Sequence, residues 1–289
     1  MDSTELQTAN WRIIWRRFKK HRVAYVGFFF FLALLLLVTA GPYVAPYELD
    51  QVSLGARMNG PSSLHWFGTD ELGRDTWVRI MYGGRVSLAV GMTVGISTVI
   101  LGGLVGILAG YIGGVVDNLL MRLVDTIYTI PRIVLLLVLS KVAGPGLVNI
   151  IVILVALEWT GAARLARGAV LSFREQEFVL AAQCLGASRW RVMLRHLLPN
   201  SLAPLIVAAT LDAGAAIRAE TTLSFLGLGI QPPTPSWGNL LTNASTNIFI
   251  APLQVFLPGI FIFLALMIFN LLGDALRDAM DPRLAQARR

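Results

Sequence analysis

The sequence predicts an all-α polytopic membrane protein with six transmembrane helices and both termini in the cytoplasm. Of its 289 residues, 55% are hydrophobic and only 14% are charged, whereas a soluble domain carries about 25% charged residues. Basic side chains concentrate at 1–22, 164–195 and 277–289, which together hold 16 of the 24 Lys and Arg residues and flank apolar stretches. This distribution is typical of membrane topology signals and argues against nucleic acid as a partner.

Six apolar stretches are long enough to cross a bilayer, which takes about 20 residues of helix. They are predicted at about 23–44, 85–117, 123–142, 147–163, 201–228 and 253–273. Asp125, Pro131 and Arg132 interrupt the third stretch. The resulting division has a basic N-terminus at 1–22, a first transmembrane helix at 23–46, a periplasmic segment with an amphipathic helix at 47–85, a core of five transmembrane helices at 86–284 and a tail at 285–289.

The positive-inside rule sets the orientation of these helices. The basic N-terminus and the basic loop at 164–195 fall on the cytoplasmic side, while the loops at 143–146 and 231–250 contain no Lys or Arg. The four arginines of the outer segment 48–85 are balanced by five acidic residues. The apolar run at 23–40 is not followed closely by a signal-peptide cleavage site, which would have small residues at two positions separated by one residue. We therefore expect that the first helix is not cleaved.

The second predicted helix is dense in glycine, with small-xxx-small pairs at Gly91/Gly95, Gly102/Gly106 and Gly106/Gly110. Glycine lets helix backbones approach closely in lipid, where helices have no hydrophobic drive to associate. The glycines therefore indicate close packing, either within this chain or against a second membrane subunit.

The outer segment has its own local signals. Thr69 is expected to cap a short helix with acidic residues in its first turn. Asp75 and Arg79 are spaced for an ion pair one helical turn apart. Trp77 and Trp237 suit a membrane–water interface, and the proline-rich stretch before Trp237 is expected to be a rigid loop.

The sequence lacks the residue motifs that several kinds of catalysis require. None of the three lysines follows a glycine, so there is no GxxxxGK[ST] phosphate-binding loop, and the three histidines form no HExxH motif. The single cysteine, Cys184, leaves no internal disulfide and suggests no metal partner. We therefore expect no catalytic residue, metal site or cofactor in this chain.

The segment EFVLAAQCLGASRWRVMLRHLLP, residues 177–199, interrupts the apolar pattern with small residues and arginines. Apolar residues at helical spacing on both sides of Gly186 predict two short amphipathic helices, with Pro199 near the start of the fifth span. A helix lying on anionic lipid is one interpretation. The adjacent small residues Ala181 and Ala182 favour another, a surface that a second protein approaches closely.

This segment resembles the EAA loop of binding-protein-dependent ABC importers, which reads EAA, three residues, Gly, nine residues and then I-x-L-P. Here Leu180 stands where the family has Glu, and His196 stands where it has Ile. In that family the loop docks in a groove of the ATP-binding subunit. The resemblance implies a cytoplasmic coupling loop at 167–200. Its candidate contact residues are Leu180, Ala181, Ala182, Gly186, Ala187, Ser188, Arg191, Arg195 and Pro199.

Three further blocks extend the resemblance over nearly the whole chain: FGTDELGRDTWVRIMYGGRVSL at 67–88, LSFLGLGIQPPTPSWG at 223–238 and LLGDALRDAMDPRL at 271–284. They are similar to the C-type membrane subunits of dipeptide, oligopeptide and nickel importers (DppC-like permeases). The resemblance implies a type I ABC importer permease fold in the bacterial inner membrane. It also implies a solute that is a di- or oligopeptide, nickel, glutathione or another small molecule.

The same resemblance implies partners. These are a second permease of the B type, two ATP-binding subunits that bind ATP and Mg, and a periplasmic or lipid-anchored solute-binding protein. Trp77 and Trp237 are candidates for contact with that binding protein. Membrane lipid surrounds the spans.

Charged residues inside the predicted spans are costly in lipid unless they meet a partner or water. One interpretation is structural pairing between helices, such as Asp125 with Arg132. The other is a hydrated path for the solute, with Asp212, Arg218 and Glu220 as candidates. Ion coupling in a stand-alone secondary transporter would also use such residues and is the alternative function, although the sequence has no convincing internal repeat of the kind such transporters often contain.

Overall fold

The computed structural model describes residues 22–280, where the regular secondary structure is helical apart from one isolated bridge between Thr69 and Asp75. The helices are α2 (Arg22–Ala40), α3 (Thr76–Ile112), α4 (Gly114–Thr129), α5 (Arg132–Ala143), α6 (Leu147–Phe173), α7 (Glu177–Cys184), α8 (Arg189–Val192), α9 (Leu198–Phe225), α10 (Trp237–Ser245) and α11 (Leu253–Met280). Short helical turns lie at Gly41–Tyr43, Leu54–Ala56 and Met193–Leu197. The tail predicted at 285–289 and all of the basic N-terminus except Arg22 lie outside the described residues.

Within that range five helices are long and apolar enough to cross a membrane, and a sixth span results if α4 and α5 are counted together. This pair, which we call the arm, is bent by 89°. Pro131 has no N–H to continue the helical hydrogen bonds, and Ile130 before it is extended, as residues before proline tend to be. The predicted interruption of the third span is thus present. It is a sharp turn of the chain and not a small kink within one transmembrane helix.

Helix α3 begins at Thr76, inside the segment predicted to lie outside the membrane at 47–85. The Asp75 carboxylate caps it by accepting a hydrogen bond from the Val78 N–H at 3.0 Å. With 37 residues, α3 is about 56 Å long at 1.5 Å per residue. Its ends therefore extend beyond the hydrocarbon core of about 30 Å.

The prediction of a short helix after Thr69 is wrong. The chain there forms a tight loop in which the Gly73 N–H donates to the Asp70 carbonyl at 2.9 Å and Gly73 takes a φ of +75°. The predicted ion pair between Asp75 and Arg79 is also wrong. Asp75 is used as the helix cap, and the buried Arg79 guanidinium lies 3.4 Å from the Asp70 carboxylate.

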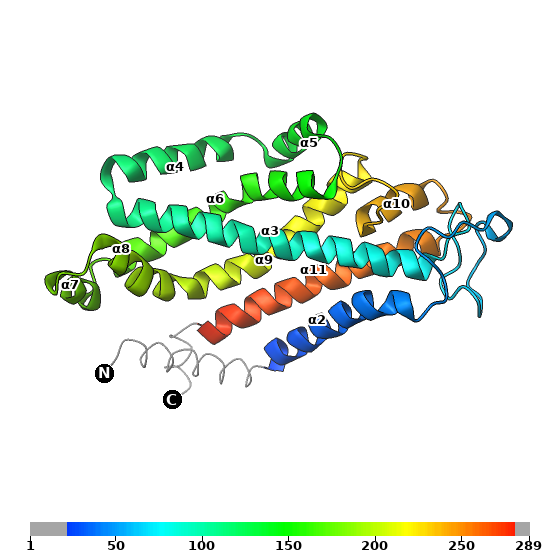
Figure 1. Cartoon of the computed structure of the whole chain (residues 1–289), viewed down its shortest axis with the longest axis horizontal. Helices are drawn as coiled ribbons and strands as arrows, with labels where there is room; N and C mark the ends of the chain where they lie inside the picture. Colours follow the sequence, from blue (N-terminus) through cyan, green and yellow to red (C-terminus); the bar gives the residue numbers. More distant parts are fainter. Residues whose placement is uncertain (1–21, 281–289) are drawn as a thin grey trace.

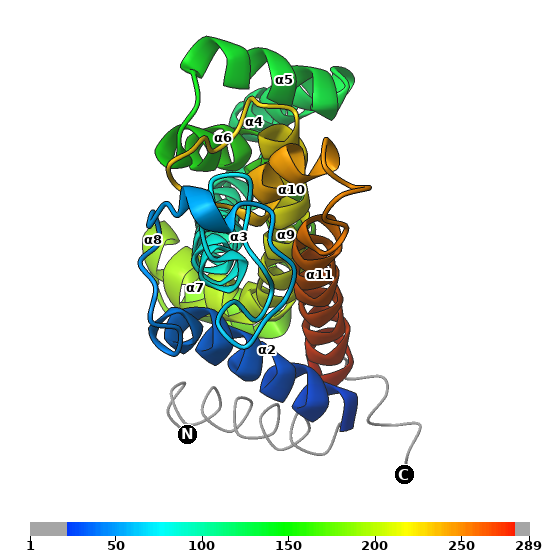
Figure 2. The same ribbon diagram turned by 90° about the vertical axis from the view of Figure 1, so that its right-hand side faces the viewer.

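Helix α3 runs through the middle of the bundle, in contact with α6 on one side and α9 on another (Figure 1; Figure 2). The glycine-rich face makes these contacts: Gly102 and Gly106 lie against the α6 backbone, and Gly91 and Gly95 lie against α9. A Cβ atom at any of the four would collide with a carbonyl oxygen of the neighbouring helix. Of the two interpretations of these glycines, packing within the chain is therefore confirmed.

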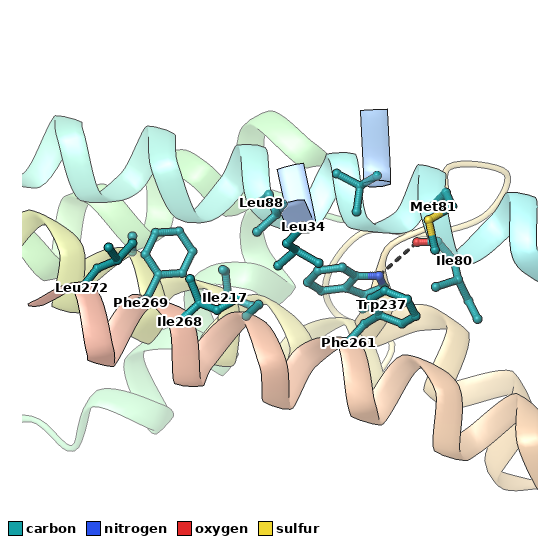
Figure 3. Packing of buried hydrophobic residues seen from close by; sticks show 13 residues of the cluster. Leu34, Ile80, Met81, Leu88, Ile217, Trp237, Phe261, Ile268, Phe269 and Leu272 are labelled. Atoms are coloured by element: carbon teal, nitrogen blue, oxygen red, sulfur yellow. Dashed lines mark hydrogen bonds between the residues drawn. The ribbon is translucent and has the colours of Figure 1, made fainter. Parts of the chain in front are cut away.

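The largest apolar core lies between α2, α3, α9, α10 and α11, and Figure 3 shows its side chains. Trp237, the first residue of α10, is fully buried there and stacks on Phe261 at 6.0 Å between ring centres. Its indole N–H donates to the Ile80 carbonyl at 3.0 Å, as the dashed line in Figure 3 shows. The proline-rich loop that precedes Trp237 is thereby fixed to α3.

Candidate functional site

The elbow, which we define as residues 174–192, projects from one end of the bundle and contains α7 and α8 (Figure 1). Helix α7 ends before Gly186, whose φ of +81° is a left-handed conformation that glycine adopts without strain. Ser188 then caps α8 by accepting a hydrogen bond from the Arg191 N–H at 3.4 Å. The predicted turn at Gly186 is present, but the second helix continues through a π-helical turn into α9, with Pro199 in its first turn.

Large apolar side chains are exposed on the outer surface of the elbow, beside charged ones such as Glu177 and Arg191. Leu185 is 90% exposed, Trp190 63% and Leu180 47%. The other predicted contact residues are also exposed or half-buried: Ala181, Ala182, Gly186, Ala187, Ser188, Arg191, Arg195 and Pro199. A cluster of exposed apolar side chains at the tip of a projecting element is typical of a surface that another molecule covers.

The opposite side of the elbow is anchored to the bundle. Val179 is the buried residue of α7 and packs in an apolar cluster with side chains of α3, α6 and α9. The Arg174 guanidinium donates to the Gly110 carbonyl at 3.3 Å, and the Gln183 amide donates to the Tyr111 hydroxyl at 3.5 Å. These contacts tie the elbow to the end of α3 and leave its outer surface free.

A second group of polar residues lies where α5, α6 and α9 meet. The Arg132 guanidinium contacts the Glu158 carboxylate, is attracted by Asp212 and is repelled by Arg218. Asp212 also accepts a hydrogen bond from the Thr98 hydroxyl at 3.1 Å. We call Arg132, Glu158, Asp212 and Arg218 the charge cluster. Within residues 22–280 no three His, Cys, Asp or Glu side chains are placed to hold a metal ion.

Glu220 does not join the charge cluster, contrary to the prediction that grouped it with Asp212 and Arg218. Glu220 lies on the opposite side of α9 from Arg218, because two residues along a helix turn the side chain by about 200°, and like Asp212 it contacts α3. It is fully buried and accepts hydrogen bonds from the Ser87 hydroxyl at 3.1 Å and the Ser224 hydroxyl at 2.7 Å. This burial contradicts a role for Glu220 in lining a path.

The predicted pair of Asp125 with Arg132 is wrong as well. Asp125 accepts a hydrogen bond from Arg164 on α6 at 2.6 Å, and Arg132 contacts Glu158. The bend at Pro131 is the reason, because it turns α5 away from the face of α4 that carries Asp125. Both charges do pair with another helix, but that helix is α6 in each case.

Comparison with known proteins identifies the family. Residues 102–286 match the family described as "Binding-protein-dependent transport system inner membrane component", which covers more than half of the chain. The chain belongs to this permease family. Residues 10–61 match the "N-terminal TM domain of oligopeptide transport permease C". The protein is therefore a multi-span permease of an ABC importer, located in the bacterial inner membrane.

Individual relatives agree with this assignment. The dipeptide transport system permease protein DppC of Bacillus subtilis is 42% identical over 271 residues, which are 93% of this chain and 85% of the relative. The glutathione transport system permease protein GsiD of Salmonella typhimurium is 42% identical over 275 residues, 95% of this chain and 91% of the relative. These relatives are transport permeases, in agreement with the family to which this chain belongs.

Among solved structures, the permease is similar to the inward-facing MetNI methionine ABC transporter. The TM-score is 0.50 and the identity 20%, over 68% of this chain and 95% of the other. At this identity the likeness concerns the fold alone. It supports the predicted type I importer permease fold.

Of the two tryptophans predicted to contact a binding protein, Trp77 and Trp237, one is buried. Trp237 is 0% exposed, which contradicts its prediction as a contact for a binding protein, because α10 docks its first residue into the core. Trp77 is half-buried and donates its indole N–H to the Gly41 carbonyl at 2.8 Å. Trp66 packs edge-to-face against Trp77, with 5.4 Å between ring centres, and is 46% exposed. Nothing in the sequence around Trp66 and Trp77 indicates which of the two side chains is the more exposed.

Proposed function

We propose that this permease forms one half of the membrane pathway of an ATP-driven importer and that the elbow couples it to the ATP-binding subunits. The observation that carries the proposal is an exposed apolar surface on an element that is rigidly anchored to α3 and α6. A coupling element needs such an anchor, since force applied to a loose loop is lost as local motion. The elbow end of the bundle then faces the cytoplasm, where both termini also lie.

The proposed complex contains this chain, a second permease of the B type, two ATP-binding subunits and a solute-binding protein. ATP and Mg are bound and ATP is hydrolysed by the ATP-binding subunits, because this sequence has no phosphate-binding loop. The solute-binding protein, periplasmic or anchored by lipid, meets the end of the bundle opposite the elbow. Trp77 and its exposed neighbour Trp66 are the proposed contacts there.

Cross-linking from Cys184 tests the coupling proposal. Cys184 is the single cysteine of the chain and is exposed on the elbow. In membrane vesicles that contain the assembled importer, a maleimide–benzophenone probe at Cys184 is expected to capture an ATP-binding subunit. The Cys184→Ser variant is the control and should give no product. Capture of phospholipid alone overturns the proposal.

A second measurement addresses the alternative function. Uptake by this chain alone in proteoliposomes, driven by a proton gradient without ATP, would support a stand-alone secondary transporter. Family membership does not favour that alternative. We expect no uptake without the partner subunits.

We propose that the charge cluster lines part of the solute path. An exposed arginine within a span, such as Arg218, needs water or an opposite charge, and a hydrated path supplies both when an anionic solute passes. The relatives are named for dipeptide and glutathione transport, and such solutes carry carboxylates. We therefore propose a di- or oligopeptide, or the related small solute glutathione, as the solute. Nickel, which only the family resemblance suggests, is the other candidate.

Removing the positive charge of Arg218 is expected to slow uptake of solutes with a free carboxylate. In the reconstituted complex, Arg218→Gln should lower uptake of the dipeptide Ala-Ala by about tenfold, because a hydrogen bond to a charged group contributes roughly 1.5–3 kcal/mol and 1.4 kcal/mol is a factor of ten. Uptake of its C-terminal amide should change little, and Arg218→Lys should retain most activity. Equal losses for the acid and the amide would contradict the carboxylate contact and indicate pairing with another subunit.

A further inference from the structure

The arm formed by α4 and α5 is joined to α6 by three ion pairs, which we call the ladder. They are Asp117 with Arg167, Asp125 with Arg164, and Arg132 with Glu158. We propose that the ladder consists of positioning residues that carry movement of the elbow into the arm and so to the charge cluster. The inference rests on the proposed coupling through the elbow and adds how that movement reaches the path.

The geometry of the ladder is ordered along both helices. Arg167 donates from Nε and Nη2 to the two carboxylate oxygens of Asp117 at 2.5 and 2.6 Å, a bidentate pair that fixes orientation as well as distance. Arg164 donates to Asp125 at 2.6 Å and its guanidinium lies 4.1 Å from the centre of the Tyr128 ring. Since α4 and α6 run in opposite directions, successive acids along α4 meet successive arginines back along α6.

The arm has little other attachment. Val124 is the buried residue of α4, and Leu136 and Ser140 are the buried residues of α5. Figure 1 shows the arm along the outside of α3 and α6. Apolar packing therefore does little to fix α4, whereas α5 is held where Leu136 packs among side chains of α3, α6 and α9. The pair of Arg132 with Glu158 holds its partners firmly, because the Glu158 side chain is only 7% exposed and a buried charge without its partner is expensive. The bidentate geometry of Asp117 with Arg167 fixes the orientation of that pair.

Helix α6 connects the ladder to the elbow without a break. It is a single helix from Leu147 to Phe173, and the elbow begins at Arg174. Arg167 lies about two turns from that junction. At the other end, Arg132 belongs both to the ladder and to the charge cluster. A rotation or shift of the elbow is thus transferred along α6 to each ion pair in turn and ends at the proposed path.

The test follows the position of the arm directly. Spin labels at Leu119→Cys on α4 and Ile260→Cys on α11, in a Cys184→Ser background, report the distance between the arm and the bundle; both sites are exposed. In the assembled importer, addition of ATP and vanadate should shift the population of two arm positions. Asp117→Asn should reduce that shift about fivefold or more, the lower range of coupling between sites.

Charge exchange distinguishes transmission from a loss of structure. The double variant Asp117→Arg with Arg167→Asp should recover most of the ATP-dependent shift that Asp117→Asn loses. Arg122→Gln is the matched control, since Arg122 is an exposed charge on α4 with no ion pair to any residue between 22 and 280, and it should behave as the wild type. If the double variant does not fold, Asp125→Asn replaces it and should also reduce the shift.

Two results overturn the inference. One is an unchanged ATP-dependent shift in both Asp117→Asn and Asp125→Asn, and the other is a folded double variant that recovers nothing. Cross-linking from Cys184, with the native cysteine in place, separates this failure from failure of the proposed function. If the elbow does not capture an ATP-binding subunit, the proposed function fails. If it does and the arm still moves without the ladder, the inference alone fails.

Discussion

Leu185→Asp is expected to release the ATP-binding subunits from this permease without unfolding it. Leu185 is 90% exposed at the turn of the elbow, so it stabilises the isolated chain little, yet it lies at the centre of the surface proposed for docking. An apolar residue at the centre of an interface contributes about 2 kcal/mol or more. Placing a carboxylate there adds its desolvation. We expect the dissociation constant of the ATP-binding subunit to rise about 30-fold or more.

The measurement is a binding titration of the purified ATP-binding subunit against the detergent-solubilised permease pair, with thermal unfolding in parallel. Phe249→Asp is the matched control, because Phe249 is 99% exposed and precedes α11 at the opposite end of the bundle. It should leave this titration unchanged. An unaltered dissociation constant for Leu185→Asp, with an unaltered Tm, would show that the outer surface of the elbow is not the docking surface.

Gly106→Ala is expected to give the largest loss of stability for the smallest chemical change. A Cβ atom at Gly106 collides with the Ala163 carbonyl oxygen and would lie 2.7 Å from the Ala166 Cβ. Neither group can swing aside, since one is backbone and the other is fixed directly to it. The two helices must separate, and overpacking of this kind costs about 1–3 kcal/mol. At about 2–4 °C per kcal/mol, Tm should fall by several degrees.

Gly168→Ala is the control for this substitution. Gly168 lies in α6, the helix that Gly106 contacts, but a Cβ atom there meets nothing within 4 Å. Alanine in a helix interior is more favourable than glycine by roughly 0.5–1 kcal/mol, so Tm should stay constant or rise. Thermal unfolding of the permease in the same detergent compares the two variants. Equal shifts for both would contradict the close contact between α3 and α6.

The sequence was most informative where the signal is local. Gly186 lies in a left-handed turn as its spacing between two apolar helical patterns predicts, and Pro131 interrupts the third span as its missing N–H requires. The glycines of α3 predict a close helix contact for the same reason, since only the absence of a side chain permits it. Each of these outcomes depends on the backbone chemistry of one residue and its neighbours along the chain.

The sequence was least informative about partners across helices. Asp75 and Arg79 have the right spacing for a pair, yet the carboxylate caps α3 and the guanidinium meets Asp70. Trp237 has the composition of an interface residue but lies in the core because α10 folds back over α3. Burial and pairing of this kind depend on which face of each helix meets which neighbour.

By itself, therefore, the sequence determined that this is a helical membrane protein with two short helices bent at Gly186, because hydrophobicity, charge at span ends and turn residues act over a few neighbouring positions. Its resemblance to importer permeases supplied the function. Only the tertiary structure decided that Glu220 is buried while Arg218 is exposed, and that Asp117, Asp125 and Arg132 of the arm pair with α6. Those choices depend on the 89° bend of the arm and on the close approach of α3 to its neighbours. Both bring together residues that are far apart in the chain.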